Sequence, residues 1–291
     1  MYRELQQFIV LVEQASVTKA ATVLGITQSA LSKSLQRLED HLGLQLAERG
    51  PRGLVLTEEG RGIYDHARRV DAEMRSLELD ARTLGEGRRR RIRIGASPSW
   101  SIACIPDLVA QIGQSEPDVE LSVHVDLETE LLRLLAQGEL DIALGNTDLE
   151  LSDHHVGRDA FVTVDVRIAA RAGAVLAAPD LPTLLARDWI DYHNALDQPA
   201  WDGASIRSRV RGRIVKTSSW IDALLIAARM DALIPLPAHL AAFLPKFGLQ
   251  FMDGVTPIAQ FNAGLRYRTS FAATRTGRKV CDAAKALMCA Q

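Results

Sequence analysis

The sequence predicts an N-terminal all-α winged helix-turn-helix, a long linking helix and a C-terminal two-lobed α/β domain. Three observations predict this fold: helical apolar spacing in residues 1–60, a heptad pattern in 58–84, and short strands alternating with helices beyond residue 91. The 291 residues leave room for a small and a large domain, because single domains usually hold about 100–200 residues.

The composition is typical of a soluble globular protein. Hydrophobic residues make up 47% of the chain and charged residues 24%, and the net charge of −2 does not by itself indicate nucleic acid. The apolar run 8–12 is too short for a signal peptide, and charged residues interrupt the apolar stretch 221–244. Cys104, Cys281 and Cys289 form no CxxC pair, as is usual in a reduced compartment. We expect a cytoplasmic protein without a membrane segment.

Three helices are predicted in the N-terminal domain. Apolar residues at helical spacing indicate a first helix that ends near Gln14. Ser16 is a suitable N-cap for a second helix over 17–24, and Thr27 for a third over 28–41. The glycine between the second and third helices supplies a turn, so the pair predicts a helix-turn-helix.

The outward face of helix 28–41 carries residue types that contact DNA. Short hydrogen-bonding side chains at its start suit base edges in the major groove, and the basic residues further along suit phosphates. Two arginines in the Gly/Pro turn 49–53 predict a wing that reaches the backbone or the minor groove. The alternative is a helical bundle whose polar side chains only face water. The predicted DNA-binding residues are Thr18, Gln28, Ser29, Ser32, Lys33, Gln36, Arg37, Arg49 and Arg52.

The N-terminal domain, called the head below, resembles the DNA-binding signature of the LysR family of bacterial transcriptional regulators. The resemblance lies in the run 16–43, SVTKAATVLGITQSALSKSLQRLEDHLG, and continues in LAER at 46–49 and LTEEG at 56–60. Ala47 departs from the phenylalanine that is usual there, which weakens one wing-packing contact and removes no DNA contact. The resemblance implies sequence-specific binding to promoter DNA, with RNA polymerase as a further partner if the protein is an activator.

A long helix is predicted from Thr57 to Leu84, where Gly85 ends it. Its apolar positions alternate in steps of four and three residues, which is typical of a coiled coil. We call these positions the heptad seam; they predict a homodimer that presents two recognition helices to two half-sites. Packing of this helix on its own domain is the alternative. The family resemblance implies the same dimer, with assembly to a homotetramer. The heptad seam consists of Ile63, Ala67, Val70, Met74, Leu77, Ala81 and Leu84.

The remaining residues predict a two-lobed α/β domain. Strands at 92–96, 121–125 and 140–144 alternate with helices, which favours a parallel sheet covered on both faces, and the pattern restarts after residue 161. Periplasmic-binding-protein sensor domains have this layout, and the effector domain of the LysR family is similar to it. The predicted boundaries are 1–57 for the DNA-binding domain, 58–87 for the linker helix and 88–291 for the effector-binding domain, with lobe I at about 92–160 and 265–291 and lobe II at about 161–264.

The effector cleft is expected at the carboxyl ends of the strands, where helix N-termini offer free N–H groups. Hydroxyl groups beside a helix N-terminus suit a carboxylate, and Trp100 or Trp220 would stack on a ring or sugar. The hydroxyl residues are also ordinary helix caps, so both roles stay open. The predicted effector-binding residues, where the family resemblance also places the cleft, are Ser97, Ser99, Trp100, Thr129, Asn146, Thr147, Thr217 and Ser218.

The turn 229–231 departs from the glycine-rich turn that the LysR family has before this strand. An altered second-lobe wall would change the ligand class or abolish the effector response. The alternative function is therefore an effector-independent repressor or architectural DNA-binding protein with a degenerate sensor domain. A more distant alternative is a solute-binding protein or an enzyme with an accessory helical head.

No catalytic or metal site is predicted. The run 95–99 lacks the closing glycine of a GxSxG nucleophile motif, and the adjacent His154 and His155 have no ligand spacing around them. Cys281 and Cys289 are separated by about 12 Å of helix, too far for a disulfide switch. No cofactor is expected apart from a small-molecule effector, whose identity the sequence does not give.

Overall fold

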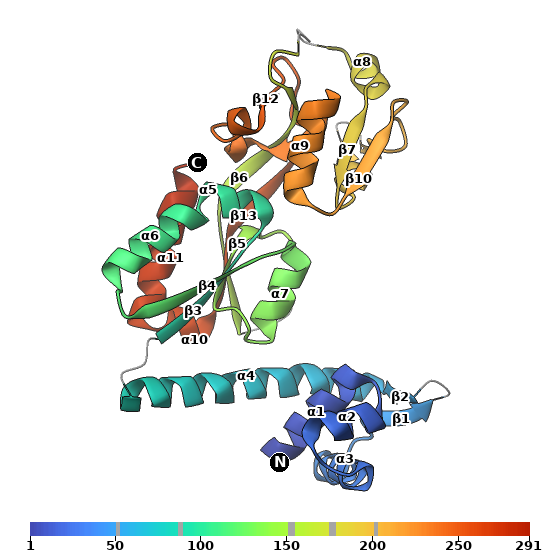
Figure 1. Ribbon diagram of the computed structural model, residues 1–291, viewed down its shortest axis with the longest axis vertical. Coiled ribbons are helices and arrows are strands. Elements are labelled where there is room, and N and C mark those ends of the chain that lie inside the picture. The colour runs from blue at the N-terminus through green and yellow to red at the C-terminus, as the bar shows by residue number, and fades with distance from the viewer. Residues whose placement is uncertain (51–52, 87–89, 151–154, 175–178, 201–202) are drawn as a thin grey trace. The chain divides into compact units, whose positions relative to one another are not determined.

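The computed structural model describes residues 1–291 apart from 51–52, 87–89, 151–154, 175–178 and 201–202 (Figure 1). Two compact units are formed, one by residues 1–91 with 136–139 and the other by residues 92–135 with 140–291. Each unit has its own hydrophobic cores.

Local capping signals start the second and third helices of the first unit where the sequence predicts them. The Ser16 hydroxyl accepts the N–H of Lys19 at 3.4 Å, and the Thr27 hydroxyl accepts the N–H of Ala30 at 3.2 Å. Gly25 ends the second helix in the left-handed conformation, with φ of 65°. The elements of this unit are α1 (Tyr2–Gln14), α2 (Val17–Leu24), α3 (Gln28–Leu42), β1 (Ala47–Gly50), β2 (Gly53–Leu56) and α4 (Glu58–Glu86).

The core of this unit holds the hairpin and α4 against the first three helices. Phe8 on α1 and Leu38 on α3 are each 1% exposed at its centre. The Glu39 carboxylate accepts the N–H of Leu46 at 2.7 Å, which fixes the start of the hairpin. At Gly60 an added Cβ would lie 1.9 Å from the carbonyl oxygen of Leu46, so only glycine fits this contact.

A seven-stranded sheet runs through the second unit. Its strands follow the order β11, β6, β13, β5, β3, β4, and β12 pairs with β6. The long strands β6 and β13 pair from Val156–Arg268 at one end to Val166–Ala259 at the other. The strands are β3 (Arg90–Ala96), β4 (Val119–Val125), β5 (Ile142–Asn146), β6 (Val156–Arg171), β11 (Ile234–Pro237), β12 (Leu249–Phe251) and β13 (Ala259–Arg268).

The sheet is mixed, whereas the alternation of strands and helices predicted parallel sheets. Strands β3 and β5 are parallel, but β13 is antiparallel to both β5 and β6, and β11 and β12 are antiparallel to β6. The reason is that β6 leaves lobe I and β13 returns to it, so that neighbouring crossing strands run in opposite directions. The predicted lobe boundaries near residues 160 and 264 fall within these two strands.

Helices cover the sheet in both lobes (Figure 1). Trp100, Leu108 and Val280 belong to the core of lobe I, and Trp189 and Leu224 to the two cores of lobe II. In lobe I the helices are α5 (Pro98–Ala103), α6 (Ile105–Ser115), α7 (Glu128–Ala136), α10 (Thr269–Ala272) and α11 (Arg275–Cys289). Lobe II adds α8 (Leu181–Ala186), the parallel strands β7 (Trp189–Tyr192) and β10 (Ile214–Thr217), the short pair β8 (Pro199–Ala200) and β9 (Ala204–Ser205), and α9 (Trp220–Met230).

The helical segment after β3 is broken at Cys104, between α5 and α6. Pro106 has no N–H to donate to the carbonyl of Ile102, so the helix cannot continue through this position. Among the helices of the described residues, none combines the length and the apolar character needed to cross a membrane.

Candidate functional site

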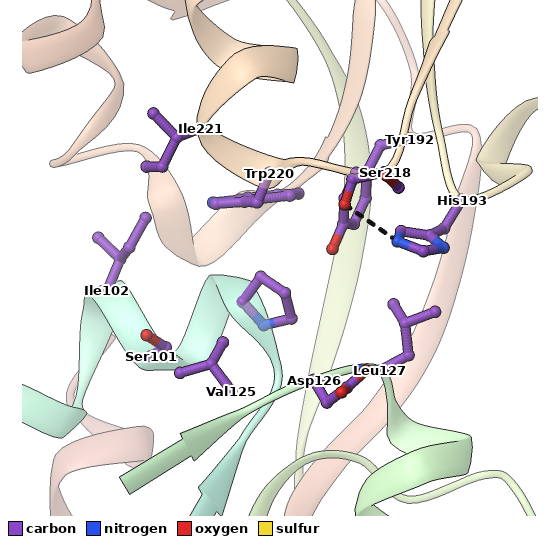
Figure 2. Close-up of a pocket in the computed structure, with 11 residues that line it drawn as sticks. Ser101, Ile102, Val125, Asp126, Leu127, Tyr192, His193, Ser218, Trp220 and Ile221 are labelled. Atoms are coloured by element: carbon purple, nitrogen blue, oxygen red, sulfur yellow. Dashed lines mark hydrogen bonds between the residues drawn. The ribbon is translucent and has the colours of Figure 1, made fainter.

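A pocket of about 410 Å³ lies between the two lobes of the second unit. Figure 2 shows its walls: the lobe II side chains of Tyr192 and Trp220 face Val125, Asp126 and Leu127 of lobe I. The carboxyl ends of β4, β7 and β10 meet here. This agrees with the strand-end rule, by which ligands of α/β folds bind at the carboxyl ends of the strands. The lining residues are Pro98, Ser101, Ile102, Val125, Asp126, Leu127, Tyr192, His193, Ser218, Trp220 and Ile221.

The lobe II wall is aromatic and internally braced. The Tyr192 and Trp220 rings meet edge to face, with centroids 5.0 Å apart and planes at 71°. Tyr192 also meets the His193 ring edge to face, at 4.6 Å. The Nε2–H of His193 donates to the carbonyl of Ser218 at 3.2 Å. These contacts join the side chains of Tyr192, Trp220 and His193 on this wall.

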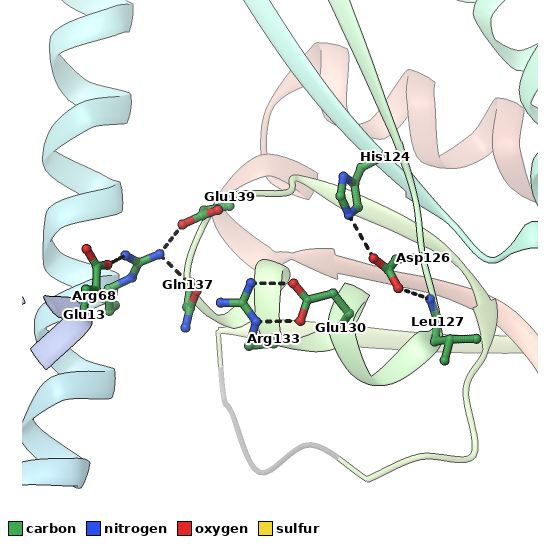
Figure 3. Close-up of polar contacts among 9 residues, drawn as sticks. All are labelled: Glu13, Arg68, His124, Asp126, Leu127, Glu130, Arg133, Gln137 and Glu139. Carbon is green, nitrogen blue, oxygen red and sulfur yellow. Dashed lines mark hydrogen bonds and ion pairs between the residues drawn. The ribbon is translucent and has the colours of Figure 1, made fainter. Parts of the chain in front are cut away.

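The charged groups at the pocket are acidic. The Asp126 carboxylate accepts the N–H of Leu127 at 2.8 Å and lies 3.6 Å from His124 Nε2 (Figure 3). The next acidic residue, Glu128, accepts the N–H of Asn146 at 3.4 Å. Burial raises the pKa of Tyr192, and the negative charges of Glu128 and Asp126 raise it further. The phenol is therefore neutral at neutral pH.

The predicted effector residues are distributed between the pocket and the core. Ser218 lies on the pocket wall. Ser97 and Ser99 are only 4% and 7% exposed, and Trp100 is fully buried, stacked on His239 with centroids 3.9 Å apart. Trp100 is thus a core side chain, because α5 turns positions 99, 100 and 103 inward while Pro98, Ser101 and Ile102 face the pocket.

The other predicted effector residues have structural partners or face solvent. Thr217 accepts the N–H of Ser219 at 3.1 Å, and Thr129 is exposed on α7. Asn146 accepts the N–H of Asp148 at 2.8 Å. Thr147 is fully buried and donates its hydroxyl to the carbonyl of Asn262 at 3.1 Å, which joins the end of β5 to β13.

Sequence reasoning missed most of the wall, although a signal for it was present. Asp126 and Leu127 directly follow β4, and His193 directly follows β7, so the strand-end rule applied to every residue type would have found them. To find the pocket residues of α5, the helical spacing of residues 98, 101 and 102 would have had to be distinguished from that of the buried residues 99, 100 and 103.

The second candidate site is the exposed face of α3. Leu31, Ser34 and Leu38 are buried on one side of this helix. The Thr27 and Ser29 hydroxyls lie 3.1 Å apart at its start. Thr18 on α2 is exposed, whereas Arg52 and the side chain of Arg49 lie outside the described residues. The predicted DNA-binding residues that α3 exposes together are Gln28, Ser29, Ser32, Lys33, Gln36 and Arg37.

The heptad seam on α4 divides into two parts. Ala67 is 2% exposed and Ile63 is half-buried, and both pack into the core of the helical head. Met74 is half-buried, whereas Val70 and Leu77 are 44% and 61% exposed. The side chains of Ala81 and Leu84 lie outside the described residues. The start of the seam therefore fixes α4 to its own head, and the exposed positions beyond it are available to a second copy.

Polar contacts reinforce the attachment of α4 to α1. Asp71 is 4% exposed and accepts hydrogen bonds from Tyr2 and Gln6, both at 3.0 Å. Arg68 forms an ion pair with Glu13 (Figure 3). Because these contacts lie within the head, the direction in which α4 leaves it is fixed.

All three cysteines are free thiols, of which Cys104 is buried, Cys281 half-buried and Cys289 exposed. Burial raises the pKa of both Cys104 and Cys281 to about 12, so these thiols stay protonated. Among the described residues, no three or more His, Cys, Asp or Glu side chains are grouped to hold a metal ion. His154 lies outside the described residues.

Two family models match the chain. Residues 2–61 match the bacterial regulatory helix-turn-helix protein, lysR family, and residues 85–288 match the LysR substrate binding domain. Among curated proteins, the SDS degradation transcriptional activation protein of a Pseudomonas strain is 33% identical over 143 residues, which cover 48% of this chain and 46% of that protein. The HTH-type transcriptional regulator YfeR of Shigella flexneri is 25% identical over 292 residues, covering 98% and 91%.

Solved structures share the fold over the whole chain. The LysR family regulator CbnR has a TM-score of 0.63 at 17% identity and covers 99% of both chains. Full-length LysG from Corynebacterium glutamicum has a TM-score of 0.67 at 17% identity, covering 100% of this chain and 98% of that one. Both domain matches and this fold lead to one assignment: the chain belongs to the LysR family of transcriptional regulators, with a DNA-binding helix-turn-helix and a C-terminal substrate-binding domain.

Proposed function

We propose that this protein binds promoter DNA through α3 as a homodimer, and that a small molecule in the pocket between the lobes alters this binding. The observation that carries the proposal is the exposed face of α3, where Gln28 and Ser32 stand at the start of the helix and Lys33 and Arg37 further along. Side chains of the first kind read base edges and those of the second kind neutralise phosphates.

The exposed positions of the heptad seam support the dimer. Val70 and Leu77 are large apolar side chains in consecutive heptads of α4, and both face solvent in the single chain. Pairing of two such helices would remove them from water. A dimer presents two copies of α3 to half-sites about 34–36 Å apart or a multiple of this distance. Assembly of two dimers into a homotetramer, contact with RNA polymerase at activated promoters and a cytoplasmic location are parts of the same proposal.

The crossing strands give the effector a way to act. The side chain of Asn262 on β13 donates to Asp148 at 2.9 Å and accepts from Thr163 on β6 at 3.2 Å. This cluster holds the crossing strands together between the lobes. A ligand that contacts both lobes favours whichever lobe arrangement it binds more tightly, and in this way shifts the population of DNA-binding conformations.

The unusual turn 229–231 does not form the pocket wall. Asp231 adopts the left-handed conformation, with φ of 56°, and caps the C-terminal end of α9 where glycine is common. Its carboxylate pairs with Arg187 at 2.8 Å. Trp220 and Ile221, which line the pocket, are at the opposite end of this helix. The proposal of an effector-independent regulator therefore gains no support from this turn.

Selection of random duplex DNA on the full-length protein, followed by footprinting at physiological salt, tests the proposed function. We expect a pair of sites related by two-fold symmetry, bound at least about 10³-fold more tightly than scrambled DNA. Binding without sequence preference would contradict the role of α3 as a reader.

Substitutions on α3 should separate base reading from phosphate binding. Gln28→Ala or Ser32→Ala is expected to lower affinity for the selected site by about 5- to 150-fold and to relax base preference, because each removes a base contact. Lys33→Ala should weaken binding to all sequences alike and reduce the salt slope by about one unit. Electrophoretic mobility shifts at several salt concentrations measure both effects.

The matched control is Gln114→Ala, an exposed glutamine on α6 in the second unit, which should leave DNA binding unchanged. Equal losses on selected and scrambled DNA for Gln28→Ala, Ser32→Ala and Lys33→Ala would contradict this division between base and phosphate contacts.

A further inference from the structure

A carboxylate ligand is usually bound by positively charged side chains, and the described residues of this pocket wall do not provide them. Among the described residues that line the pocket there is no lysine or arginine. The nearby Lys216 donates its ammonium group to the side chain of Asn194 at 2.5 Å and does not belong to the wall. The serines expected to hold a carboxylate, Ser97 and Ser99, are buried and do not line the pocket. An anion would therefore meet no lysine or arginine among the described lining residues.

Two carboxylates belong to the segment 126–128, of which Asp126 and Leu127 line the pocket. Asp126 is on the lobe I wall, and its ion-pair partner His124 is charged only when protonated. Glu128, the first residue of α7, follows the lining residue Leu127 without lining the pocket itself, and its side chain accepts the backbone N–H of Asn146. Burial raises the pKa of the Tyr192 phenol, and the charges of Glu128 and Asp126 raise it further.

The aromatic and apolar surfaces complete a site for a positively charged amphipathic molecule. The Tyr192 and Trp220 rings meet edge to face on the lobe II wall (Figure 2). Ile102, Val125 and Leu127 provide apolar surface on the lobe I wall. Aromatic faces attract ammonium and guanidinium groups, and they also bury hydrocarbon. The volume of about 410 Å³ lies at the small end of the range for ligand pockets, so it suits a single ring or a short chain.

We propose that this pocket selects an organic cation, an amine or guanidine on a small apolar body, in place of a carboxylate. The inference rests on the proposed function of the pocket as the effector site. Asp126 and Glu128 supply the negative charge, and the Tyr192 and Trp220 rings supply the surface on which the cation and its apolar body lie.

A matched set of probes tests the charge preference directly: 2-phenylethylamine, 2-phenylethanol and 3-phenylpropionate share one ring and differ in charge. Titration of the full-length protein, followed by tryptophan fluorescence and calorimetry, is expected to give an amine affinity at least about tenfold above that of the carboxylate, because opposite charges attract across a partly desolvated site. A carboxylate that binds as tightly as the amine, or an amine that does not bind, would overturn the proposal.

Charge-neutralising variants identify the groups responsible. Glu128→Gln and Asp126→Asn should each lower amine affinity by about five- to tenfold while leaving 2-phenylethanol unchanged. The matched control is Glu130→Gln on the same helix, because the Glu130 carboxylate pairs with Arg133 Nε at 2.7 Å (Figure 3) and Glu130 does not line the pocket. Equal loss of amine and alcohol binding in Glu128→Gln and Asp126→Asn would point to a damaged pocket and overturn the assignment of charge recognition to them.

The same protein, footprinted on its selected DNA with and without saturating amine, separates the two proposals. Amine selectivity with a changed footprint supports both. Amine selectivity with an unchanged footprint supports the ligand class and contradicts effector control of DNA binding. A footprint changed only by the carboxylate contradicts the ligand class and leaves the regulatory function standing.

Discussion

Replacing Asp141 by alanine is expected to lower the free energy of unfolding of the second unit by about 3–5 kcal/mol, because it removes the buried carboxylate that faces the buried Arg268 and the side chain of Arg93. The Asp141 carboxylate accepts the backbone N–H and the Nη2 of Arg93 at 2.8 and 2.7 Å, and it lies 3.7 Å from Nη1 of Arg268. The side chains of Asp141 and Arg268 are each 8% exposed. One carboxylate therefore ties β3 to β13 at the start of β5.

Urea denaturation followed by tryptophan fluorescence measures this loss, since all four tryptophans of the chain lie beyond residue 91. The control is Glu130→Ala, which removes an ion pair whose two side chains are 36% and 47% exposed and should cost less than about 1 kcal/mol. A loss for Asp141→Ala no larger than that of the control would show that the arginines find other partners.

The second unit is expected to lose stability as the pH falls from about 6.5 towards 4, with His239 contributing on the order of 3 kcal/mol. His239 is 8% exposed and stacked on Trp100, and its burial lowers the pKa of the imidazole from 6.5 to about 4. In this pH window the unfolded chain binds a proton that the folded chain does not bind. The contribution is therefore complete above pH 6.5, falls with decreasing pH, and changes no further below about pH 4.

Comparison with His239→Phe isolates this contribution, because phenylalanine keeps a ring against Trp100 and cannot be protonated. Urea denaturation at pH 7, 5.5 and 4 should show a smaller loss of stability in the variant than in the parent protein, by on the order of 3 kcal/mol at the lowest pH. Parallel pH profiles for the two proteins would mean that His239 becomes charged in the folded state.

Much of the fold follows from signals that lie within single segments. Ser16 and Thr27 cap the helices that they were predicted to start, and the apolar spacing of α3 separates its buried residues from its polar face. The order of strands and helices also identifies the two lobes. Such signals are readable because a cap and an amphipathic face involve residues within one or two helical turns of each other.

The heptad seam shows where a local pattern has two meanings. Ala67 and Val70 belong to the same apolar repeat, yet Ala67 is 2% exposed in the head and Val70 is 44% exposed. The pattern defines one apolar stripe on α4, but only the packing of α1 against its beginning decides which part of that stripe is already covered.

The sequence by itself determined the family, the helix-turn-helix and its outward face. With the general rule that ligands bind at the carboxyl ends of strands, it also predicted the region of the cleft. Only the tertiary structure decided that Trp100 belongs to the core, that Asn146 and Thr147 hold the end of β5, and that Tyr192 and Trp220 form the pocket wall. The pocket joins segments near residues 100, 126, 192 and 220. Which face of each segment meets the others depends on the long pairing of β6 with β13, and no single segment carries that information.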